Sequence, residues 1–335
     1  MWSICKKEWT QYFSSLTGYL IISFYLIVNG LLLFVIPNYN LLDFGYASLQ
    51  VYFDFAPWFL LLLVPAITMR SFSDEFKQGT YEVLHSMPFS SLQLVLGKLL
   101  GSLLIVVAAI APTIFYAVVL NALSATGGID WGATFGSYIG LLFLGAVYTA
   151  VGVFASSLTK NSAIALLVSI IISILLLQSF DWLSTVSFFA NGYDFYIKQL
   201  GLSLHYNNMS KGLIKMTDLI YFISILGLFI LGTIENLKGK IKYLFLLIAI
   251  IGANYLSNIF PIQFDLTKEK RYTLSASSTE VISQIQAPVT VHLYLGGDLP
   301  SNYKTISNAA IALLDQLHQI NPSLIKWNLE IPNQL

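Results

Sequence analysis

The chain has 335 residues, of which 56% are hydrophobic and 10% are charged. Soluble domains carry about 25% charged residues, so this deficit indicates a protein that crosses a membrane several times. A mean hydropathy of +0.72 supports the same interpretation. The formal net charge is zero, and the chain has no basic tail of the kind that binds nucleic acid. The single cysteine, Cys5, excludes an intrachain disulfide and a thiolate metal cluster.

Seven apolar segments are candidates for membrane-spanning helices, since a span needs about 20 apolar residues. They cover residues 19–36, 49–69, 99–120, 135–155, 163–177, 219–234 and 243–260. In the second segment, Pro57 is expected in the first helical turn, and Pro65 is expected to kink the helix. Five glycines are candidates for close contacts between helices: Gly97, Gly101, Gly140, Gly145 and Gly152.

The orientation of the spans follows from Lys and Arg in short loops, which collect on the cytoplasmic side. With a cytoplasmic N-terminus, the cytoplasmic segments hold nine of these residues: Lys6, Lys7, Arg70, Lys77, Lys98, Lys160, Lys238, Lys240 and Lys242. The opposite short loops hold three: Lys198, Lys211 and Lys215. The sequence therefore predicts a cytoplasmic N-terminus and, after seven spans, an extracytoplasmic C-terminal segment.

The loop between the second and third spans, residues 70–90, contains the most polar stretch in the first 120 residues. Two short helices are predicted in it. Phe72 and Phe76 share a face of the first helix, and Gly79 suits the left-handed position that closes it. Thr80 is expected to cap the second helix, and Pro88 is expected to end it.

Two further features describe this loop, which we call the elbow. Ser90 with Gln93 is expected to form a capping box for the third span. Four charged residues are expected to face the cytosol: Asp74, Glu75, Lys77 and Glu82. The elbow is interpreted either as a solvated connector or as a docking surface for a cytoplasmic partner. Its length and its own caps favour docking.

The elbow resembles the coupling region of the permease subunits of type-2 ABC transporters. The matching residues are Glu75, Gly79, Thr80, Glu82, Leu84 and Pro88, followed by Leu96-Gly97-Lys98-Leu99-Leu100-Gly101. The resemblance implies a bundle of membrane helices whose elbow rests on an ATPase supplied by another chain. The ATPase-coupling residues would then be Glu75, Lys77, Gln78, Gly79 and Glu82.

The N-terminal segment, 2–13, fits a helix that lies in the membrane interface, as the same family has. One face would be largely aromatic, with Trp2, Cys5, Trp9 and Phe13. The other face would be charged, with Lys6, Lys7 and Glu8.

No residue pattern indicates catalysis, a metal site or a bound cofactor. The chain has no G-x-x-x-x-G-K-[ST] phosphate loop, and its Gly97-Lys98 pair lacks both the earlier glycine and the following Ser or Thr. The four histidines do not have the spacing of metal ligands. The protein is therefore expected not to be an enzyme, and ATP is expected to be used by a partner subunit.

The C-terminal segment changes from an apolar to an α/β pattern. Residues 289–295 and 324–331 alternate between apolar and polar positions, and an amphipathic helix lies between them, which predicts a βαβ unit with parallel strands. This segment resembles the start of the GldG-like auxiliary subunit of gliding-motility ABC systems. The residues that carry the likeness are Asp265-Leu266-Thr267, Lys270-Arg271-Tyr272-Thr273-Leu274-Ser275 and 294–300. The first six spans would then resemble a GldF-like permease fused to it.

The sequence thus predicts an all-α polytopic membrane protein with a small C-terminal extracytoplasmic α/β piece. The expected domains are a permease transmembrane domain with six spans over 1–236, a linker with a seventh span over 237–260, and a partial auxiliary domain over 261–335.

The expected function is that of the permease subunit of an ABC exporter associated with gliding motility, in the bacterial cytoplasmic membrane. Its expected partners are a cytoplasmic ABC ATPase, a second permease half, and auxiliary or extracytoplasmic motility proteins. Two alternatives remain open. An ion-coupled secondary transporter needs charged residues at mid-membrane, where Asp54 is the one candidate. A non-transporting anchor would only hold the extracytoplasmic domain.

Overall fold

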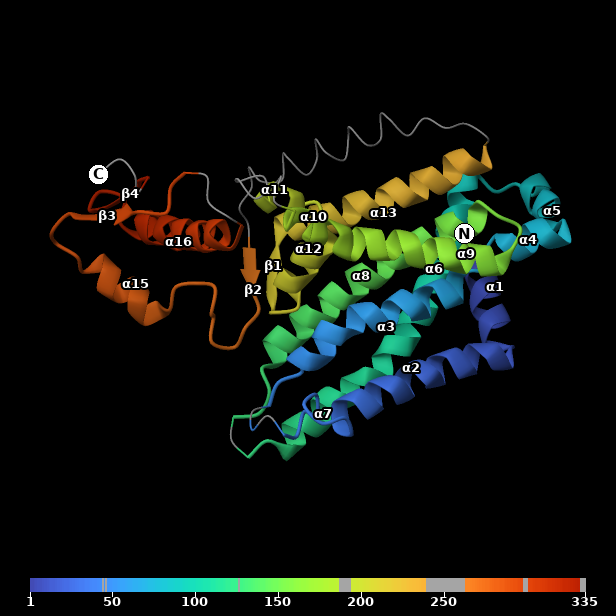
Figure 1. Cartoon of the computed structure of the whole chain (residues 1–335), viewed down its shortest axis with the longest axis horizontal. Coiled ribbons are helices and arrows are strands. Elements are labelled where there is room, and N and C mark those ends of the chain that lie inside the picture. The colour runs from blue at the N-terminus through green and yellow to red at the C-terminus, as the bar shows by residue number, and fades with distance from the viewer. Residues whose placement is uncertain are drawn as a thin grey trace. The chain divides into compact units, whose positions relative to one another are not determined.

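The computed structural model describes residues 1–43, 45, 47–125, 127–186, 194–238, 263–297 and 301–331. These residues form two compact units (Figure 1). The first unit is Met1–Leu175 with Tyr206–Phe264, and the second is Leu176–His205 with Asp265–Leu335.

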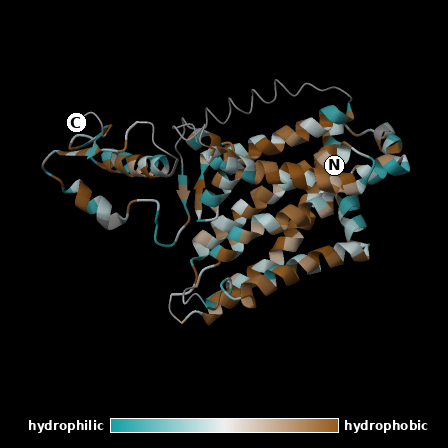
Figure 2. Ribbon diagram, in the orientation of Figure 1, coloured by the Kyte–Doolittle hydropathy of each residue, from teal (hydrophilic) through white to brown (hydrophobic). Residues whose placement is uncertain are grey.

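Six helices among the described residues are long and apolar enough to cross a membrane: Leu16–Phe34, Gln50–Gln78, Ser91–Leu123, Trp131–Ser157, Ser162–Ser184 and Met216–Leu237. They correspond to the first six predicted spans, and Figure 2 shows the apolar residues that run along them. Helices suit this environment because they satisfy every backbone hydrogen bond within the segment. The predicted seventh span, 243–260, lies outside the described residues.

The first unit is built almost entirely of helices. In chain order they are α1 (Trp2–Phe13), α2 (Leu16–Phe34), α3 (Gln50–Thr68), α4 (Ser73–Gln78), α5 (Thr80–Ser86), α6 (Ser91–Ile110), η1 (Ala111–Thr113), α7 (Ile114–Leu123), α8 (Trp131–Ser157), α9 (Ser162–Ile174) and α13 (Met216–Leu237). A short strand, β1 (Leu213–Lys215), pairs with β2 (Gln263–Asp265). Helix α12 (Leu202–Met209) crosses the boundary between the units.

Helix α8 is the centre of the first unit and packs against α3, α6, α9 and α13. Glycines on α8 make this position possible. A Cβ atom at Gly152 would collide with Thr68 on α3, and one at Gly145 would lie 3.2 Å from Cγ1 of Val106 on α6. Small residues at these points let helix backbones approach closely, which confirms the prediction made for these glycines.

Pro57 is not in the first helical turn, so that prediction is wrong. Helix α3 begins at Gln50 and continues through both Pro57 and Pro65. Proline has no N–H group, so Pro57 leaves the carbonyl of Phe53, one turn earlier, without its usual helical donor. The hydroxyl of Tyr206 donates to this carbonyl at 2.7 Å. A tertiary hydrogen bond therefore replaces the missing helical one and allows a proline in the helix interior.

The third and fifth spans also depart from regular α-helix. Pro112 lies in the 3₁₀ turn η1, which separates α6 from α7 within the third span. The fifth span passes from α9 into a π-helical turn over Leu175–Ser179 and then into α10 (Phe180–Ser184). Such irregular turns interrupt the regular hydrogen-bond ladder without ending the span.

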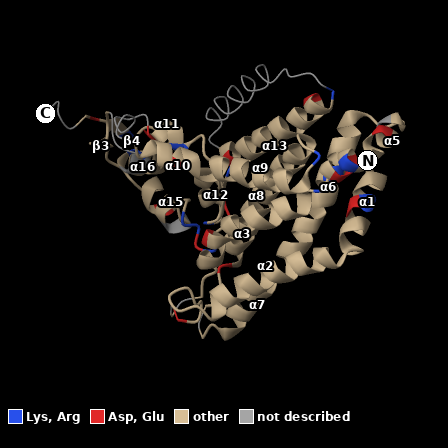
Figure 3. Cartoon of the chain, turned by 45° about the vertical axis from the view of Figure 1, so that its right-hand side comes forward, with Lys and Arg blue, Asp and Glu red and all other residues tan. Residues whose placement is uncertain are grey.

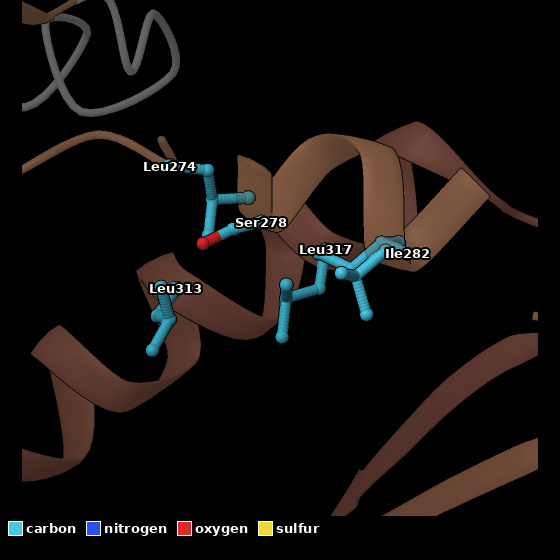
Figure 4. A pocket seen from close by; sticks show the side chains of 6 residues that line it. Leu274, Ser278, Ile282, Leu313 and Leu317 are labelled. Atoms are coloured by element: carbon cyan, nitrogen blue, oxygen red, sulfur yellow. The ribbon is translucent and has the colours of Figure 1, made fainter. Parts of the chain in front are cut away.

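The second unit contains the predicted βαβ arrangement. Its elements are α10, α11 (Asp194–Lys198), α15 (Ala276–Ser283), β3 (Val289–Leu293), α16 (Ser301–Ile320) and β4 (Ile325–Leu329). Strands β3 and β4 pair in parallel, with Val289 opposite Ile325 and Leu293 opposite Leu329. Leu274, Ser278, Val281, Ile282, Leu313 and Leu317 line a shallow cavity of about 450 Å³ (Figure 4).

Asp265 organises the segment that begins the second unit. One carboxylate oxygen accepts hydrogen bonds from the backbone N–H and hydroxyl of Thr267, at 2.9 and 2.6 Å. The other accepts from the N–H of Tyr272 at 2.8 Å and from the hydroxyl of Thr273 at 3.3 Å. Burial alone would raise the pKa of Asp265, but these four donors stabilise the charged form and hold the pKa below its ordinary value. The D-L-T and Y-T parts of the sequence are thus two halves of one closed loop.

Candidate functional site

The elbow consists of two short helices, α4 and α5, as the sequence predicts. Gly79 separates them with φ of 70°, and its N–H bonds the carbonyl of Glu75. The expectation that Thr80 caps α5 is wrong, because Thr80 is already the first residue of that helix, and no side-chain cap is found there among the described residues. The capping box before α6 is confirmed: Ser90 Oγ accepts from the N–H of Gln93 at 3.2 Å, and Gln93 Oε1 accepts from that of Ser90 at 3.1 Å.

Three aromatic rings hold the two elbow helices together. The rings of Phe72 and Phe76 are stacked with centroids 6.1 Å apart, and Tyr81 from α5 meets Phe76 edge-on at 4.8 Å. Phe72 is fully buried, and its backbone N–H donates to Ser156 Oγ of α8 at 3.4 Å. Burial, and then the nearby charge of Glu75, raise the pKa of Tyr81. The elbow is therefore a packed unit attached to the bundle, which a solvated connector would not be.

One surface of the elbow is exposed to solvent. Lys77, Gln78, Gly79 and Glu82 are all exposed, as expected for residues that meet a partner. Two apolar side chains, Val83 and Met87, are 59% and 43% exposed on the same short segment. We call these residues the elbow tip: Lys77, Gln78, Gly79, Glu82, Val83 and Met87. Sequence reasoning missed Val83 and Met87, although two apolar residues four apart in a polar loop are the signal that would have found them.

Glu75 does not face the solvent, so the expectation that its carboxylate points into the cytosol is wrong. The side chain is 10% exposed, and Oε1 lies 3.0 Å from Nζ of Lys7 on α1 and 2.9 Å from Nζ of Lys98 on α6. In so short a helix the sequence pattern does not decide which face is buried. The two lysines decide it, because a carboxylate enters the interior only when its charge is compensated.

Lys98 is a buried lysine whose ammonium group lies beside three oxygen atoms. Its side chain is 1% exposed. Nζ lies 2.8 Å from Oε1 of Glu8, 2.9 Å from Oε1 of Glu75 and 2.5 Å from the carbonyl oxygen of Ser71. The ammonium group donates hydrogen bonds to Glu8 and to the Ser71 carbonyl, and its contact with Glu75 is an ion pair. The ring of Phe72, with its centroid 4.9 Å from Nζ, adds a cation–π contact.

The two glycines beside Lys98 allow α1 to lie against α6. A Cβ atom at Gly97 would be 2.9 Å from Cβ of Ile4, and one at Gly101 would be 2.7 Å from Cβ of Glu8. The Gly-Lys-x-x-Gly spacing thus brings the backbone of α1 close enough for Glu8 to reach Lys98. Glu8 was expected on a solvent-facing charged side of α1, and the structure corrects this.

The other residues of α1 agree in part with an interface helix. Trp2 is 70% exposed and Trp9 is also exposed, whereas Cys5 is buried. Burial, and then the charge of Glu8, raise the pKa of the Cys5 thiol. The aromatic face and the buried face of α1 are therefore different faces, and Cys5 belongs to the one that contacts α6.

Acidic and basic residues gather at the end of the first unit that carries α1, α5 and the start of α6 (Figure 3). Lys7, Glu8, Glu75 and Lys98 form a continuous chain of ion pairs there, which we call the charge cluster. Of the described residues, no three His, Cys, Asp or Glu side chains are placed to hold a metal ion. The arrangement joins a buried ionic base to the exposed elbow tip.

Both parts of the chain match known protein families. Residues 268–334 match a domain of unknown function (DUF7088), which covers most of the predicted auxiliary segment. No curated protein matches the chain. Residues 2–256 match the family described as ABC-2 family transporter protein, and this match includes α1, the elbow and all six candidate spans. The chain therefore belongs to the ABC-2 transporter family, as a multi-pass membrane permease subunit and not as the ATPase.

Proposed function

We propose that this protein is the permease half of an ABC exporter and that its ATPase docks on the elbow tip. The observation that carries the proposal is the elbow tip itself: exposed charged and apolar side chains mounted on a buried, ionically anchored base. Interfaces place apolar anchors among polar neighbours in this way. Val83 and Met87 serve as the anchors, and Lys77, Gln78 and Glu82 set the orientation. Glu75 lies on the inner side of α4 and takes no part in the contact with the ATPase.

The finer parts of the proposal rest on sequence. The excess of Lys and Arg in the loops on the elbow's side supports a cytoplasmic N-terminus and a cytoplasmic elbow. The DLT and KRYTLS stretches support a link to gliding-motility systems, with auxiliary or extracytoplasmic motility proteins as further partners. One six-span subunit forms only one side of a translocation path. A second permease subunit, identical or related, completes the path in the bacterial cytoplasmic membrane.

The charge distribution argues against an ion-coupled secondary transporter. Asp54 is exposed in the second turn of α3, and its carboxylate accepts a hydrogen bond from Gln50 at 2.8 Å. A residue so close to a helix end is poorly placed for an ion pathway through the middle of the bilayer. The anchor alternative differs from the proposal in one respect, because an anchor needs no ATPase.

The test is co-purification of an ABC ATPase with the tagged protein from membranes. The variant Glu82→Lys/Val83→Asp reverses a charge and places a carboxylate at an apolar anchor. We expect at least a tenfold loss of bound ATPase, since removing interface hot spots costs about 2 kcal/mol or more. The matched control is Lys160→Glu, an exposed charge reversal between α8 and α9. Wild-type ATPase recovery with the elbow variant, or no ATPase with the wild-type protein, would contradict the proposal.

A further inference from the structure

The charge cluster joins three segments that are far apart in the sequence. Lys7 and Glu8 come from α1, Glu75 from α4 and Lys98 from α6, and the formal charges sum to zero. Glu75 is a shared partner, because its Oε1 meets both lysines. Lys98 is shared in the same way, because it meets both carboxylates. The elbow, the N-terminal helix and the third span therefore meet at one ionic junction.

Stability alone does not account for a buried junction of this kind. Taking charges out of water costs about as much as their attraction returns, so apolar residues of similar volume would stabilise the contact equally well or better. The best-attested use of buried charges is to fix one register between packed elements. Here the charges fix the positions at which α1 and α4 pack along α6. Gly97 and Gly101 contribute to the same register, since any larger residue would push α1 away.

The position of Glu75 relates the junction to the elbow tip. Glu75 and Lys77 lie in the same six-residue helix, which ends at Gln78. The aromatic contacts with Tyr81 hold α4 and α5 together. A force applied at Lys77 and Gln78 therefore moves the two helices as one short rigid body. On the inner side of α4, the ionic contact of Glu75 with Lys98 connects that body to the third span.

We infer that Lys98 is a positioning residue through which displacement of the elbow is transmitted to α1 and the third span. The inference rests on the proposed function, because the load comes from an ATPase docked on the tip. Docking and transmission are separate properties. The tip residues make the contact, and the charge cluster determines whether α6 follows when the contact moves.

The test uses the complete complex of this protein with its co-purified ATPase in lipid nanodiscs. In a Cys5→Ser background, spin labels are placed at Leu104 on α6 and Leu167 on α9, both of which are exposed. For the wild-type complex, we expect ATP with vanadate to shift the distance between the two labels. The variant Lys7→Gln/Glu75→Gln removes the elbow from the cluster and leaves Lys98 paired with Glu8, so the charge stays balanced. We expect it to lose the shift while the ATPase still co-purifies.

The control variant is Lys6→Gln, which changes an exposed lysine beside the cluster and should keep the shift. If the double variant does not fold, Glu8→Gln/Lys98→Met keeps the Lys7–Glu75 pair and separates α6 from the elbow instead. A wild-type shift in a variant that retains its ATPase would overturn the inference. Loss of the ATPase from the variant would also overturn it, because the cluster would then serve docking. Absence of any ATPase from the wild-type preparation would refute the proposed function itself.

Discussion

At the scale of single residues, the bundle depends on polar groups that find partners outside their own helix. The carbonyl of Phe53, freed by Pro57, accepts the hydroxyl of Tyr206 from a segment about 150 positions later in the chain. Phe53 is buried inside the bundle, away from water, so an unpaired carbonyl there is unfavourable. One hydroxyl thus makes an interior proline tolerable and connects α12 to α3.

Removing this hydroxyl should destabilise the protein. The variant Tyr206→Phe leaves the Phe53 carbonyl without a donor, at a cost of about 1 kcal/mol. The matched control is Tyr148→Phe, because the Tyr148 hydroxyl is buried and has no hydrogen-bond partner among the described residues. Thermal unfolding in detergent should show a lower Tm for Tyr206→Phe and an unchanged or higher Tm for the control. Equal shifts would mean that the Tyr206 hydrogen bond contributes nothing.

Asp265 makes a second residue-scale prediction, in the C-terminal unit. Its pKa is lowered in the folded protein, so its carboxylate stabilises the loop at all pH values above the unfolded pKa. This contribution is lost as the pH falls through the lowered folded pKa, below about pH 4. The variant Asp265→Asn should reproduce the loss at neutral pH.

The measurement for Asp265 is tryptic cleavage of the full-length protein at pH 7. Lys268, Lys270 and Arg271 lie inside the loop that the carboxylate closes, and Thr267 donates to it. Cleavage after these residues should become several-fold faster in Asp265→Asn. Asp315→Asn, in α16 of the same unit, serves as the control. Equal cleavage rates in Asp265→Asn and wild type would show that the loop does not depend on the carboxylate charge.

At the scale of elements, close packing rather than hydrophobicity determines how α1 lies on α6. A span buries apolar residues against lipid as well as against protein, so the hydropathic pattern does not select the contacting face. Gly97 and Gly101 select it, because they leave room where any other residue would collide with Ile4 or Glu8. The same reasoning places Gly152 of α8 against Thr68 of α3.

The natural cysteine reports directly on the contact between α1 and α6. Cys5 is 2% exposed, and its thiol pKa is raised, so little reactive thiolate is available at neutral pH. The variant Gly101→Leu should displace α1 and increase labelling of Cys5 by a maleimide several-fold. Gly227→Leu on α13 is the matched control, because no described atom lies within 4 Å of the added Cβ. Unchanged labelling of Gly101→Leu would mean that α1 is held elsewhere.

At the scale of the whole molecule, the location of the elbow decides whether an ATPase can reach it. The proposed orientation rests on nine Lys and Arg residues on one side against three on the other. In a Cys5→Ser background, a cysteine at Gln78 should escape a membrane-impermeant thiol reagent in intact cells and react in inverted vesicles. A cysteine at Asp43, in the loop before α3, should show the opposite behaviour. Labelling of residue 78 from outside intact cells would place the elbow on the wrong side.

Much of the fold could be predicted from the sequence, because its signals are local. The first six spans follow from apolar runs of sufficient length, and the bilayer requires such runs to be helical. Gly79, the Ser90–Gln93 capping box and the βαβ unit each depend on a few neighbouring residues, and all three are found where expected. The GldF-like and GldG-like assignments remain predictions.

The candidate site could be predicted only in part. Lys77, Gln78, Gly79 and Glu82 are exposed as expected, but Glu75 and Lys98 are buried. Glu75 meets a lysine 68 positions away on α1 and another 23 positions later on α6. From sequence alone, a charged residue in a short helix is predicted to lie on the surface. It can be buried only beside an opposite charge, and only the packing of α1 on α6 supplies that charge.

The sequence by itself thus determined which segments enter the bilayer, where the elbow breaks and which C-terminal strands pair. Each of these depends on forces that act within a few residues or between a segment and its solvent. Only the tertiary structure decided that four charges from three distant segments meet at one junction, with Glu75 and Lys98 buried in it. Lys98 and Glu75 can be buried only because an opposite charge lies beside each of them, and that condition is a property of the packed molecule.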